Sequence, residues 1–189
     1  MKNNRKKKQQ KRVKSLADPQ DLQPFDKAAG LLQVIIETPK GSANKYSFDA
    51  GLRIFKLKAA LPSGMSFPYD FGFLPRTLAG DGDPIDVLVL MDERAFPGCL
   101  VESRLIGVIC GEQIDGKKRI RNDRLIAVAD QNTLFTEVKK LGDLPKHFMR
   151  ELEEFFVNYH RLQRKKYKLF GCKGEQTALR LIAKTGKKK

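Results

Sequence analysis

The stretch from residue 81 to residue 90 reads Asp81-Gly82-Asp83-Pro84-Ile85-Asp86-Val87-Leu88-Val89-Leu90. Its first part carries three carboxylates at a turn, and its apolar second part predicts a buried strand. Carboxylates this close repel one another, and each raises the pKa of its neighbours unless a cation neutralises them. Magnesium prefers oxygen ligands and is usually held by one or two carboxylates together with substrate phosphates. The stretch therefore indicates a metal and phosphate centre at the entry of a strand.

Two other interpretations of this acidic turn are open. Asp, Gly and Pro all favour turns, so residues 81–84 also fit a solvated connection that leads into the strand. A calcium loop of the EF-hand type is a weaker alternative. Its sixth position requires Gly and its twelfth requires Glu, whereas this chain has Asp86 and Asp92 there.

Apolar and β-branched runs predict a mostly antiparallel sheet or a small barrel. Turns are expected at Ala50-Gly51 and at Asp115-Gly116, and the second is expected to join the last two strands as a hairpin. No internal repeat interrupts this pattern. The expected strands cover residues 31–37, 44–49, 52–58, 86–90, 99–113 and 124–129.

Two helices are predicted in the C-terminal part of the chain. Asp143 is the expected N-cap of the first helix, with Pro145 in its first turn. A second helix is expected over residues 175–184, with an apolar face turned inward. The first helix carries an apolar stripe at helical spacing, formed by Phe148, Leu152, Phe155, Tyr159 and Leu162.

Composition limits the class of protein. A chain of 189 residues with 41% hydrophobic content fits one globular domain, expected over residues 17–186. No run of eighteen apolar residues predicts a membrane span, and no apolar segment at the N-terminus predicts a secretory signal. The cysteines number three and lack the spacing of metal ligands. They are typical of reduced thiols, which favours a cytoplasmic protein.

The net charge of +15 is unevenly distributed. Residues 1–16 hold eight Lys or Arg and no acid, residues 17–160 hold 18 basic and 21 acidic residues, and residues 161–189 hold eleven basic residues and one Glu. We expect residues 1–16 to form a disordered basic tail and residues 187–189 a basic tail end. Such tails either contact polyanions such as RNA or polyphosphate without sequence specificity, or only aid solubility.

Further motifs accompany the acidic turn. Glu37-Thr38-Pro39, Asn44-Lys45-Tyr46 and the aromatic segment 67–73 precede it, and the aromatic segment 155–159 follows it. With these motifs the chain resembles the soluble family I inorganic pyrophosphatases over about residues 31–170, as a divergent member with basic tails. The resemblance implies an α+β, mostly β fold. It would be a five-stranded, OB-like closed β-barrel with helices packed outside, mainly from the C-terminal part.

The same resemblance implies roles for five carboxylates. Asp81 and Asp86 are expected to bind metal, with Asp86 bridging two ions. Asp83 is expected to act as a general base toward the nucleophilic water. Glu37 and Asp115 are expected to add metal ligands. Mg²⁺ is the expected cofactor, with Mn²⁺ or Zn²⁺ as alternatives.

Cationic and aromatic residues are expected to bind the substrate. Lys45 and Tyr159 match phosphate-binding positions of the family, and Lys58 falls where the family usually has Arg. Counting back from the strand at 125–129 places Arg124 at a family Lys and Asn122 at a metal-binding Asp. Asn keeps an oxygen but loses the charge. The neighbouring Asp123 is therefore the expected metal ligand, provided that the backbone shifts by one residue.

Four more positions depart from the family pattern. Phe67 and Phe71 stand where the family has Tyr, so two hydroxyls are lost. Ser47 stands where an acid is usual, and His160 replaces a Lys. These changes favour an enzyme that is slower or altered in its metal preference.

Two functions follow from these patterns. The first is hydrolysis of inorganic pyrophosphate to two phosphates by a metal-activated water. The alternative is a catalytically degraded member of the family that binds polyanions or a protein partner. The first is favoured because an unused cluster of three aspartates would only cost stability through mutual repulsion. As in many family members, a homo-oligomer is expected.

Overall fold

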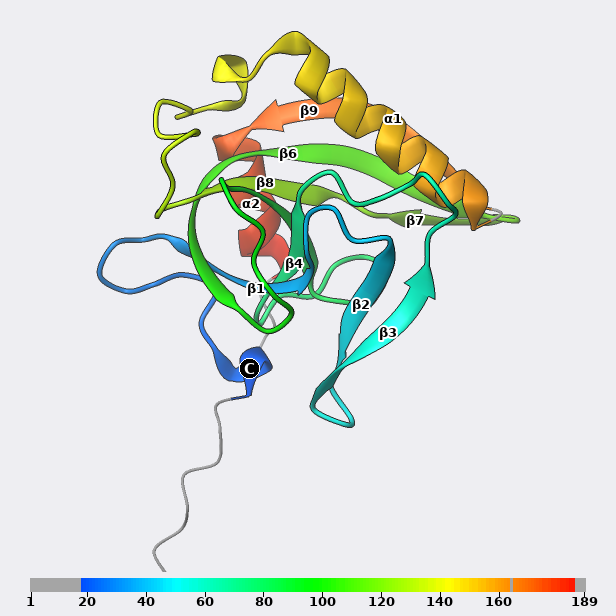
Figure 1. Ribbon diagram of the computed structural model, residues 1–189, viewed down its shortest axis with the longest axis horizontal. Coiled ribbons are helices and arrows are strands. Elements are labelled where there is room, and N and C mark those ends of the chain that lie inside the picture. Colours follow the sequence, from blue (N-terminus) through cyan, green and yellow to red (C-terminus); the bar gives the residue numbers. More distant parts are fainter. Residues whose placement is uncertain (1–17, 164, 186–189) are drawn as a thin grey trace, which may run out of the picture.

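The computed structural model describes residues 18–163 and 165–185 (Figure 1). The basic tail predicted for residues 1–16 and the tail end predicted for residues 187–189 lie outside this part of the chain. The elements of the described part are β1 (Leu32–Thr38), β2 (Asn44–Asp49), β3 (Ile54–Ala60), β4 (Asp70–Leu74), β5 (Ile85–Leu90), β6 (Leu100–Asp115), β7 (Lys118–Arg121), β8 (Arg124–Ala129), α1 (Lys146–Leu162), β9 (Lys166–Gly174) and α2 (Glu175–Thr185), with short 3₁₀ turns at Pro19–Asp21 and Leu141–Asp143.

Five strands close into a ring. β1 pairs with β4, β4 with β5, β5 with β8, β8 with β6, and β6 again with β1. All of these pairs are antiparallel except β5 with β8, which is parallel. β7 and β9 pair with the long strand β6, and β2 and β3 form a separate hairpin. The prediction of a mostly β fold with a closed five-stranded sheet is confirmed.

The apolar run of β5 is buried on both faces, which explains its uninterrupted hydrophobic sequence. Val87 and Val89 belong to the core cluster that also contains apolar residues of α2. Leu88 and Leu90 belong to the cluster covered by α1. A shift of one residue would exchange these two faces, so the packing fixes the register of the strand and the position of Asp86 at its start.

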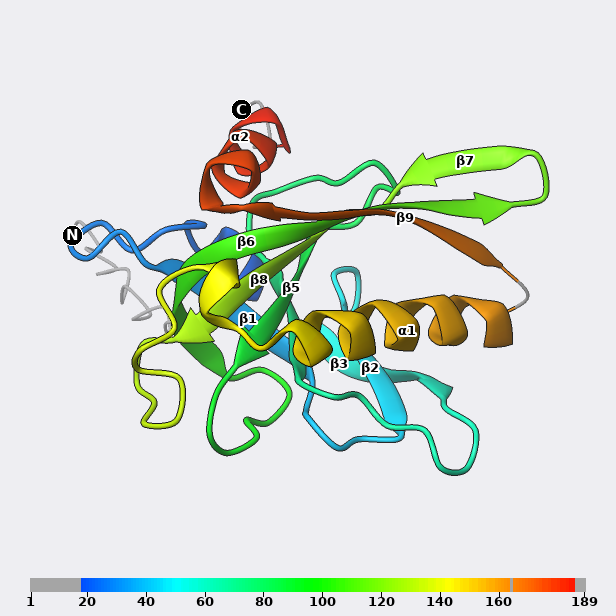
Figure 2. The ribbon, with the colours of Figure 1, turned by 90° about the horizontal axis from the view of Figure 1, so that it is seen from above.

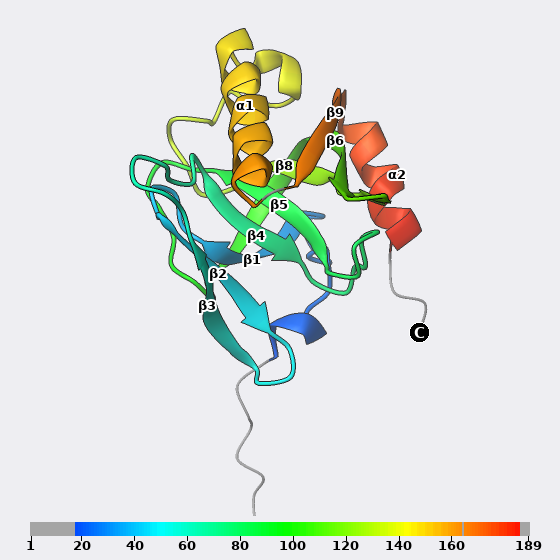
Figure 3. The same ribbon diagram turned by 90° about the vertical axis from the view of Figure 1, so that its right-hand side faces the viewer.

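The two helices lie on opposite sides of β6 and β9 (Figures 2 and 3). The stripe predicted for α1 is largely correct, because Phe148, Leu152 and Tyr159 are buried in the core. Leu162 is an exception and is exposed. The second predicted helix is confirmed as α2. Neither helix of the described part has the length and apolar character that crossing a membrane requires.

The expected start of the first helix was wrong. Asp143 does not cap α1, which begins at Lys146 after the extended residue Pro145. Instead, the Asp143 carboxylate accepts hydrogen bonds from the backbone N–H groups of Lys139 and Lys140, at 2.9 and 3.0 Å. These bonds close the preceding 3₁₀ turn. Asp143 is therefore the last residue of that turn, and its carboxylate reaches back to the backbone at the start of the turn.

The predicted hairpin turn is confirmed, but its second strand was misassigned. Asp115 pairs with Lys118 at the end of the β6–β7 hairpin, and Gly116 has φ +59°. β8 does not follow this turn directly, because β7 intervenes. It pairs instead with the first half of β6 and, in parallel, with β5. That position brings Arg124 of β8 beside Asp86.

Candidate active site

The loop before β5 presents the acidic cluster and is fixed by hydrogen bonds to its own backbone. The buried Thr77 Oγ1 accepts a hydrogen bond from Ile85 N at 2.9 Å. Asp81 Oδ1 accepts one from Asp83 N at 3.3 Å. Asp81 and Asp83 are exposed at the mouth of the strand, whereas Asp86 lies further in and is partly buried. The loop forms a turn and also presents carboxylates, so the turn interpretation and the metal-centre interpretation of this segment are compatible.

One cavity of about 500 Å³ brings most of the predicted site residues together. Carboxylates of the acidic loop face cations from other elements across it. A smaller cavity of about 130 Å³ adjoins it and adds Glu37 and Ser47. The predicted site residues that line the larger cavity are Lys45, Lys58, Asp81, Asp83, Asp86, Asp115, Arg124 and Tyr159.

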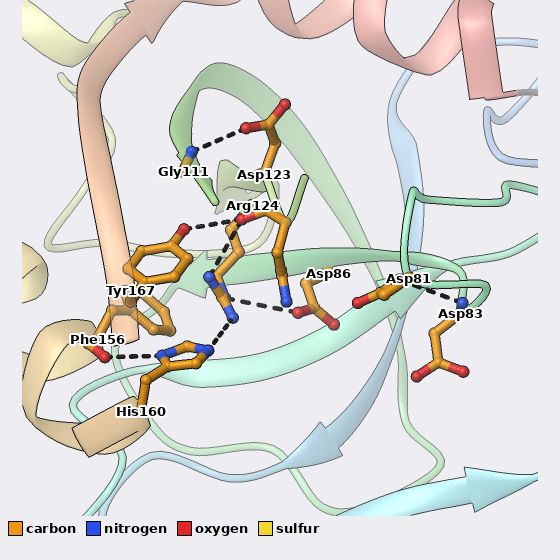
Figure 4. Close-up of polar contacts among 10 residues, drawn as sticks. Asp81, Asp83, Asp86, Gly111, Asp123, Arg124, Phe156, His160 and Tyr167 are labelled. Carbon is orange, nitrogen blue, oxygen red and sulfur yellow. Dashed lines mark hydrogen bonds and ion pairs between the residues drawn. The ribbon is translucent and has the colours of Figure 1, made fainter. Parts of the chain in front are cut away.

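Strand pairing places Asp86 directly opposite Arg124. The two residues are partners in the parallel pairing of β5 with β8, and Arg124 Nε lies 3.5 Å from Asp86 Oδ2 (Figure 4). Burial raises the pKa of Asp86, Arg124 and Lys45 lower it, and the charges of Asp81 and Asp83 raise it again, so the net shift is upward. Burial is the largest of these effects, which makes the ionised form of Asp86 costly. A further cation would stabilise it.

Lys45 lies between aromatic rings at the other side of the cavity. Its Nζ is 5.3 Å from the ring centre of Tyr159 and 5.6 Å from that of Phe71. Burial alone would lower the pKa of Lys45, but Tyr159 and Asp86 raise it above its ordinary value. The ammonium is therefore charged, and the ring of Phe71 supports it.

Glu37 reaches the smaller cavity from the end of β1. Its Oε1 accepts a hydrogen bond from Phe48 N at 2.7 Å. Burial, together with the nearby charge of Asp86, raises the pKa of Glu37 to about 7, against the opposing effects of the Phe48 N–H, Lys45 and Lys58. Ser47 lines the same small cavity as Glu37.

Arg124 is only 3% exposed, and its guanidinium lies against two aromatic rings. The guanidinium carbon is 4.3 Å from the ring centre of Phe156 and 4.9 Å from that of Tyr167. Arg124 Nη1 donates to the carbonyl oxygen of Asn122 at 3.3 Å, and Tyr167 Oη donates to the same oxygen at 2.8 Å. The sequence patterns did not single out Tyr167, because strand β9 was not expected.

Asn122 lies on the cavity wall, and Asp123 does not. The Asp123 carboxylate turns away from Arg124 (Figure 4) and accepts a hydrogen bond from Gly111 N at 2.9 Å. It also lies 2.8 Å from Arg121 Nε. The metal-ligand role predicted for Asp123 does not fit this position. The reason is the alternation of side chains along the extended backbone, which puts neighbouring residues on opposite faces.

The site fits a divalent metal through its donor set. Among the described residues, no three His, Cys, Asp or Glu side chains are arranged to enclose a metal ion. Mg²⁺ does not require such an enclosure, because one or two carboxylates, water molecules and substrate phosphates usually complete its coordination shell. Asp81 and Asp86 offer hard carboxylate oxygens on one wall, and Asp115 lines the same cavity. Burial, together with the charges of Asp81 and Asp83, raises the pKa of Asp86 against Arg124 and Lys45, so a cation beside this carboxylate would stabilise its ionised form.

The fold and this cavity define a mostly β protein in which carboxylates and cations from separate strands line one cavity. Comparison with known proteins agrees, since the family described as inorganic pyrophosphatase matches residues 34–189. The inorganic pyrophosphatase of a Synechocystis strain is 42% identical over 159 residues, which cover 84% of this chain and 92% of that protein.

Solved structures show the same relationship. The crystal structure of inorganic pyrophosphatase from Thermus thermophilus superposes with a TM-score of 0.80 at 34% identity, covering 88% of this chain and 95% of that one. The inorganic pyrophosphatase of Helicobacter pylori gives 0.74 at 33% identity, covering 82% and 91%. The chain therefore belongs to the inorganic pyrophosphatase family, and its resemblance to the soluble, family I members is confirmed.

Proposed function

We propose that the chain hydrolyses inorganic pyrophosphate to two phosphates in the larger cavity. The observation that carries this proposal is the opposition of charges across one cavity. Carboxylates of the acidic loop face Lys45, Lys58 and Arg124, although they come from separate strands. A substrate with two phosphoryl groups needs this combination, because its own negative charge must be neutralised before a nucleophile can approach.

The cations and one tyrosine bind the substrate in this proposal. Lys45 and Lys58 act as point charges toward phosphoryl oxygens, and Tyr159 offers its hydroxyl. Arg124 presents a planar guanidinium that two rings hold in place. Lys58 is exposed on β3, so its ammonium is free to adjust its position to the substrate. An ammonium does not form the bidentate contact that a guanidinium forms with a phosphate.

Asp83 is the proposed general base. It is exposed at the cavity wall, two residues from Asp81 and three from Asp86. Its carboxylate takes the proton of the attacking water, and Pro84 and the buried Ile85 anchor the loop that carries it. This role separates Asp83 from the two aspartates on either side, which are proposed as metal ligands.

Asp81 and Asp86 would hold a divalent metal, with Asp115 and Glu37 as further ligands, directly or through water. A bound Mg²⁺ would supply charge neutralisation at the phosphoryl oxygens and would make a coordinated water more acidic. Mn²⁺ and Zn²⁺ are the alternatives. A homo-oligomer and a cytoplasmic location stay predictions from the resemblance and from the cysteine pattern.

Phosphate release from pyrophosphate tests the proposal. The purified full-length chain should release phosphate with Mg²⁺, Mn²⁺ or Zn²⁺, and EDTA should abolish the release. The losses at Ser47, Phe67, Phe71 and Asn122 lead us to expect reduced activity rather than none. Absence of release with all three metals would reject the enzyme and favour the alternative, a degraded family member that binds polyanions.

A further inference from the structure

The buried guanidinium of Arg124 has incomplete hydrogen bonding. An arginine has five N–H donors and cannot lose its charge in a protein. In the described part of the chain, Arg124 Nε is buried without a hydrogen-bond partner, and its 3.5 Å contact with Asp86 is long for an ion pair. Its nearest acceptors are the carbonyl of Asn122, at 3.3 Å from Nη1, and the imidazole of His160, at 3.4 Å from Nη2. The two rings support the guanidinium, but its orientation in their plane depends on few hydrogen bonds.

The hydrogen bonds of His160 determine which of its ring nitrogens is an acceptor. Its Nδ1 lies 2.8 Å from the carbonyl oxygen of Phe156, which can only accept a hydrogen bond, so Nδ1 carries the proton. In a neutral ring the other nitrogen, Nε2, then has a free lone pair, and Arg124 Nη2 lies beside it. The ring stacks on Tyr167 at 4.5 Å with an angle of 13° between the planes.

The surroundings of His160 keep this ring neutral. The residue is 2% exposed, and burial lowers its pKa to about 4, assisted by Arg124, Lys45 and Lys165, although the bond to the Phe156 carbonyl opposes the shift. These charged groups come from β8, from β2 and from the residue just before β9. At neutral pH the imidazole is therefore an acceptor for the guanidinium rather than a second cation.

We propose that His160 is a positioning residue, whose Nε2 accepts a hydrogen bond from Arg124 and orients the guanidinium toward a substrate phosphate. This inference rests on the proposed function and deepens it. A lysine at position 160 has no lone pair for Arg124 and would place an ammonium against the buried guanidinium, whereas a neutral imidazole accepts from it.

Steady-state kinetics of substitutions at position 160 test this positioning. His160→Phe keeps a ring that can stack on Tyr167 but removes the acceptor, and we expect it to raise KM for pyrophosphate about tenfold, with a smaller change in kcat. His160→Gln retains an acceptor and should stay within about threefold of the unsubstituted enzyme. His147→Phe, at the chain's exposed second histidine, is the matched control.

A double-mutant cycle separates positioning from a structural role. In an Arg124→Ala background, His160→Phe should have no further effect on KM, because the group that it positions is gone. Additive effects, or an unchanged KM in the single variant, would overturn the inference. Circular dichroism of each variant identifies any that fail to fold, and the tautomer of the His160 ring in the unsubstituted chain then carries the test.

NMR of the two histidine rings provides a readout that does not depend on activity. At pH 7, ¹⁵N spectra should show His160 as the neutral Nδ1–H tautomer, with His147 as an internal reference. An imidazolium or an Nε2–H tautomer would overturn the inference whatever the kinetics. If the chain releases no phosphate while the Nδ1–H tautomer is present, the proposed function fails and the arrangement of His160 and Arg124 stands.

Discussion

At the scale of single residues, the segment 121–124 separates two environments. Asn122 and Arg124 face the cavity that contains the acidic loop. Arg121 and Asp123 face the opposite side and contact each other at 2.8 Å. A shift of one residue along an extended chain therefore decides which side a carboxylate faces. On the cavity side it can bind a metal, and on the other side it only accepts hydrogen bonds from the backbone and from Arg121.

Substitutions at these neighbours should have separate effects. Asp123→Ala removes the bonds to Gly111 N and Arg121, so we expect the free energy of unfolding to fall by about 1–3 kcal/mol, with Mg²⁺ affinity unchanged. Asn122→Asp adds a carboxylate to the cavity wall and should tighten Mg²⁺ binding. Urea denaturation and calorimetric titration with MgCl₂ measure the two quantities. Loss of Mg²⁺ binding in Asp123→Ala would show that Asp123 is a ligand after all.

Sequence patterns predicted most of the residues that line the cavity, but not the face on which Asp123 lies. Asp81, Asp83 and Asp86 could be predicted because they lie within six residues on one loop. The position of Asp123 could not, because it depends on the residue at which β8 begins and on its register with β5. The contact between His160 and Arg124 could not be predicted either, since it joins a helix to a strand 36 residues away.

At the scale of elements, the close approach of β9 to β6 supports the site. Gly111 of β6 lies against the ring of Tyr167, and a Cβ atom added to it would fall 2.2 Å from the tyrosine hydroxyl oxygen. That hydroxyl donates to the carbonyl of Asn122, and the same ring covers the guanidinium of Arg124. A glycine in β6 thus allows β9 to reach the wall of the cavity.

Gly111→Ala should disturb the site through Tyr167. The added methyl group must push the ring away, so we expect the free energy of unfolding to fall by about 1–3 kcal/mol and KM for pyrophosphate to rise. Gly174→Ala is the matched control in β9, because a Cβ atom added there would meet no atom of the described residues within 4 Å apart from its chain neighbours. Chemical denaturation compares the two variants. Equal stability of both would contradict the packing described for Gly111.

The sequence predicted those helices and strands whose hydrophobic pattern lies within the element itself. β1, β2 and β5 and the second helix carry their own pattern. β4 was not expected because glycine and an aspartate interrupt its aromatic residues. β9 was not expected because the strand-like alternation of exposed lysines with Tyr167 and Leu169 covers only four residues, and the rest of the strand depends on pairing with β6. Both strands form because they pair with other strands of the folded chain. Local sequence patterns contain no information about that pairing.

At the scale of the whole molecule, the cationic residues of the site are not among those that give the chain its net positive charge. The net charge of +15 is concentrated in residues 1–16 and 161–189, whereas residues 17–160 hold 18 basic and 21 acidic residues. Lys45, Lys58 and Arg124 belong to this slightly acidic part, so the folding of the ring gathers them opposite the aspartates. The three cysteines are free, as their number and spacing predicted.

The most direct test of the central claim, that this cavity hydrolyses pyrophosphate with Asp83 as its base, is the rate of phosphate release by Asp83→Asn. The matched control is Asp130→Asn, which removes the same charge from an exposed aspartate that lines neither cavity. With Mg²⁺ and saturating pyrophosphate, we predict that Asp83→Asn lowers kcat by about 10²–10⁴-fold while the control keeps the unsubstituted rate. Equal rates in the two folded variants would contradict the claim.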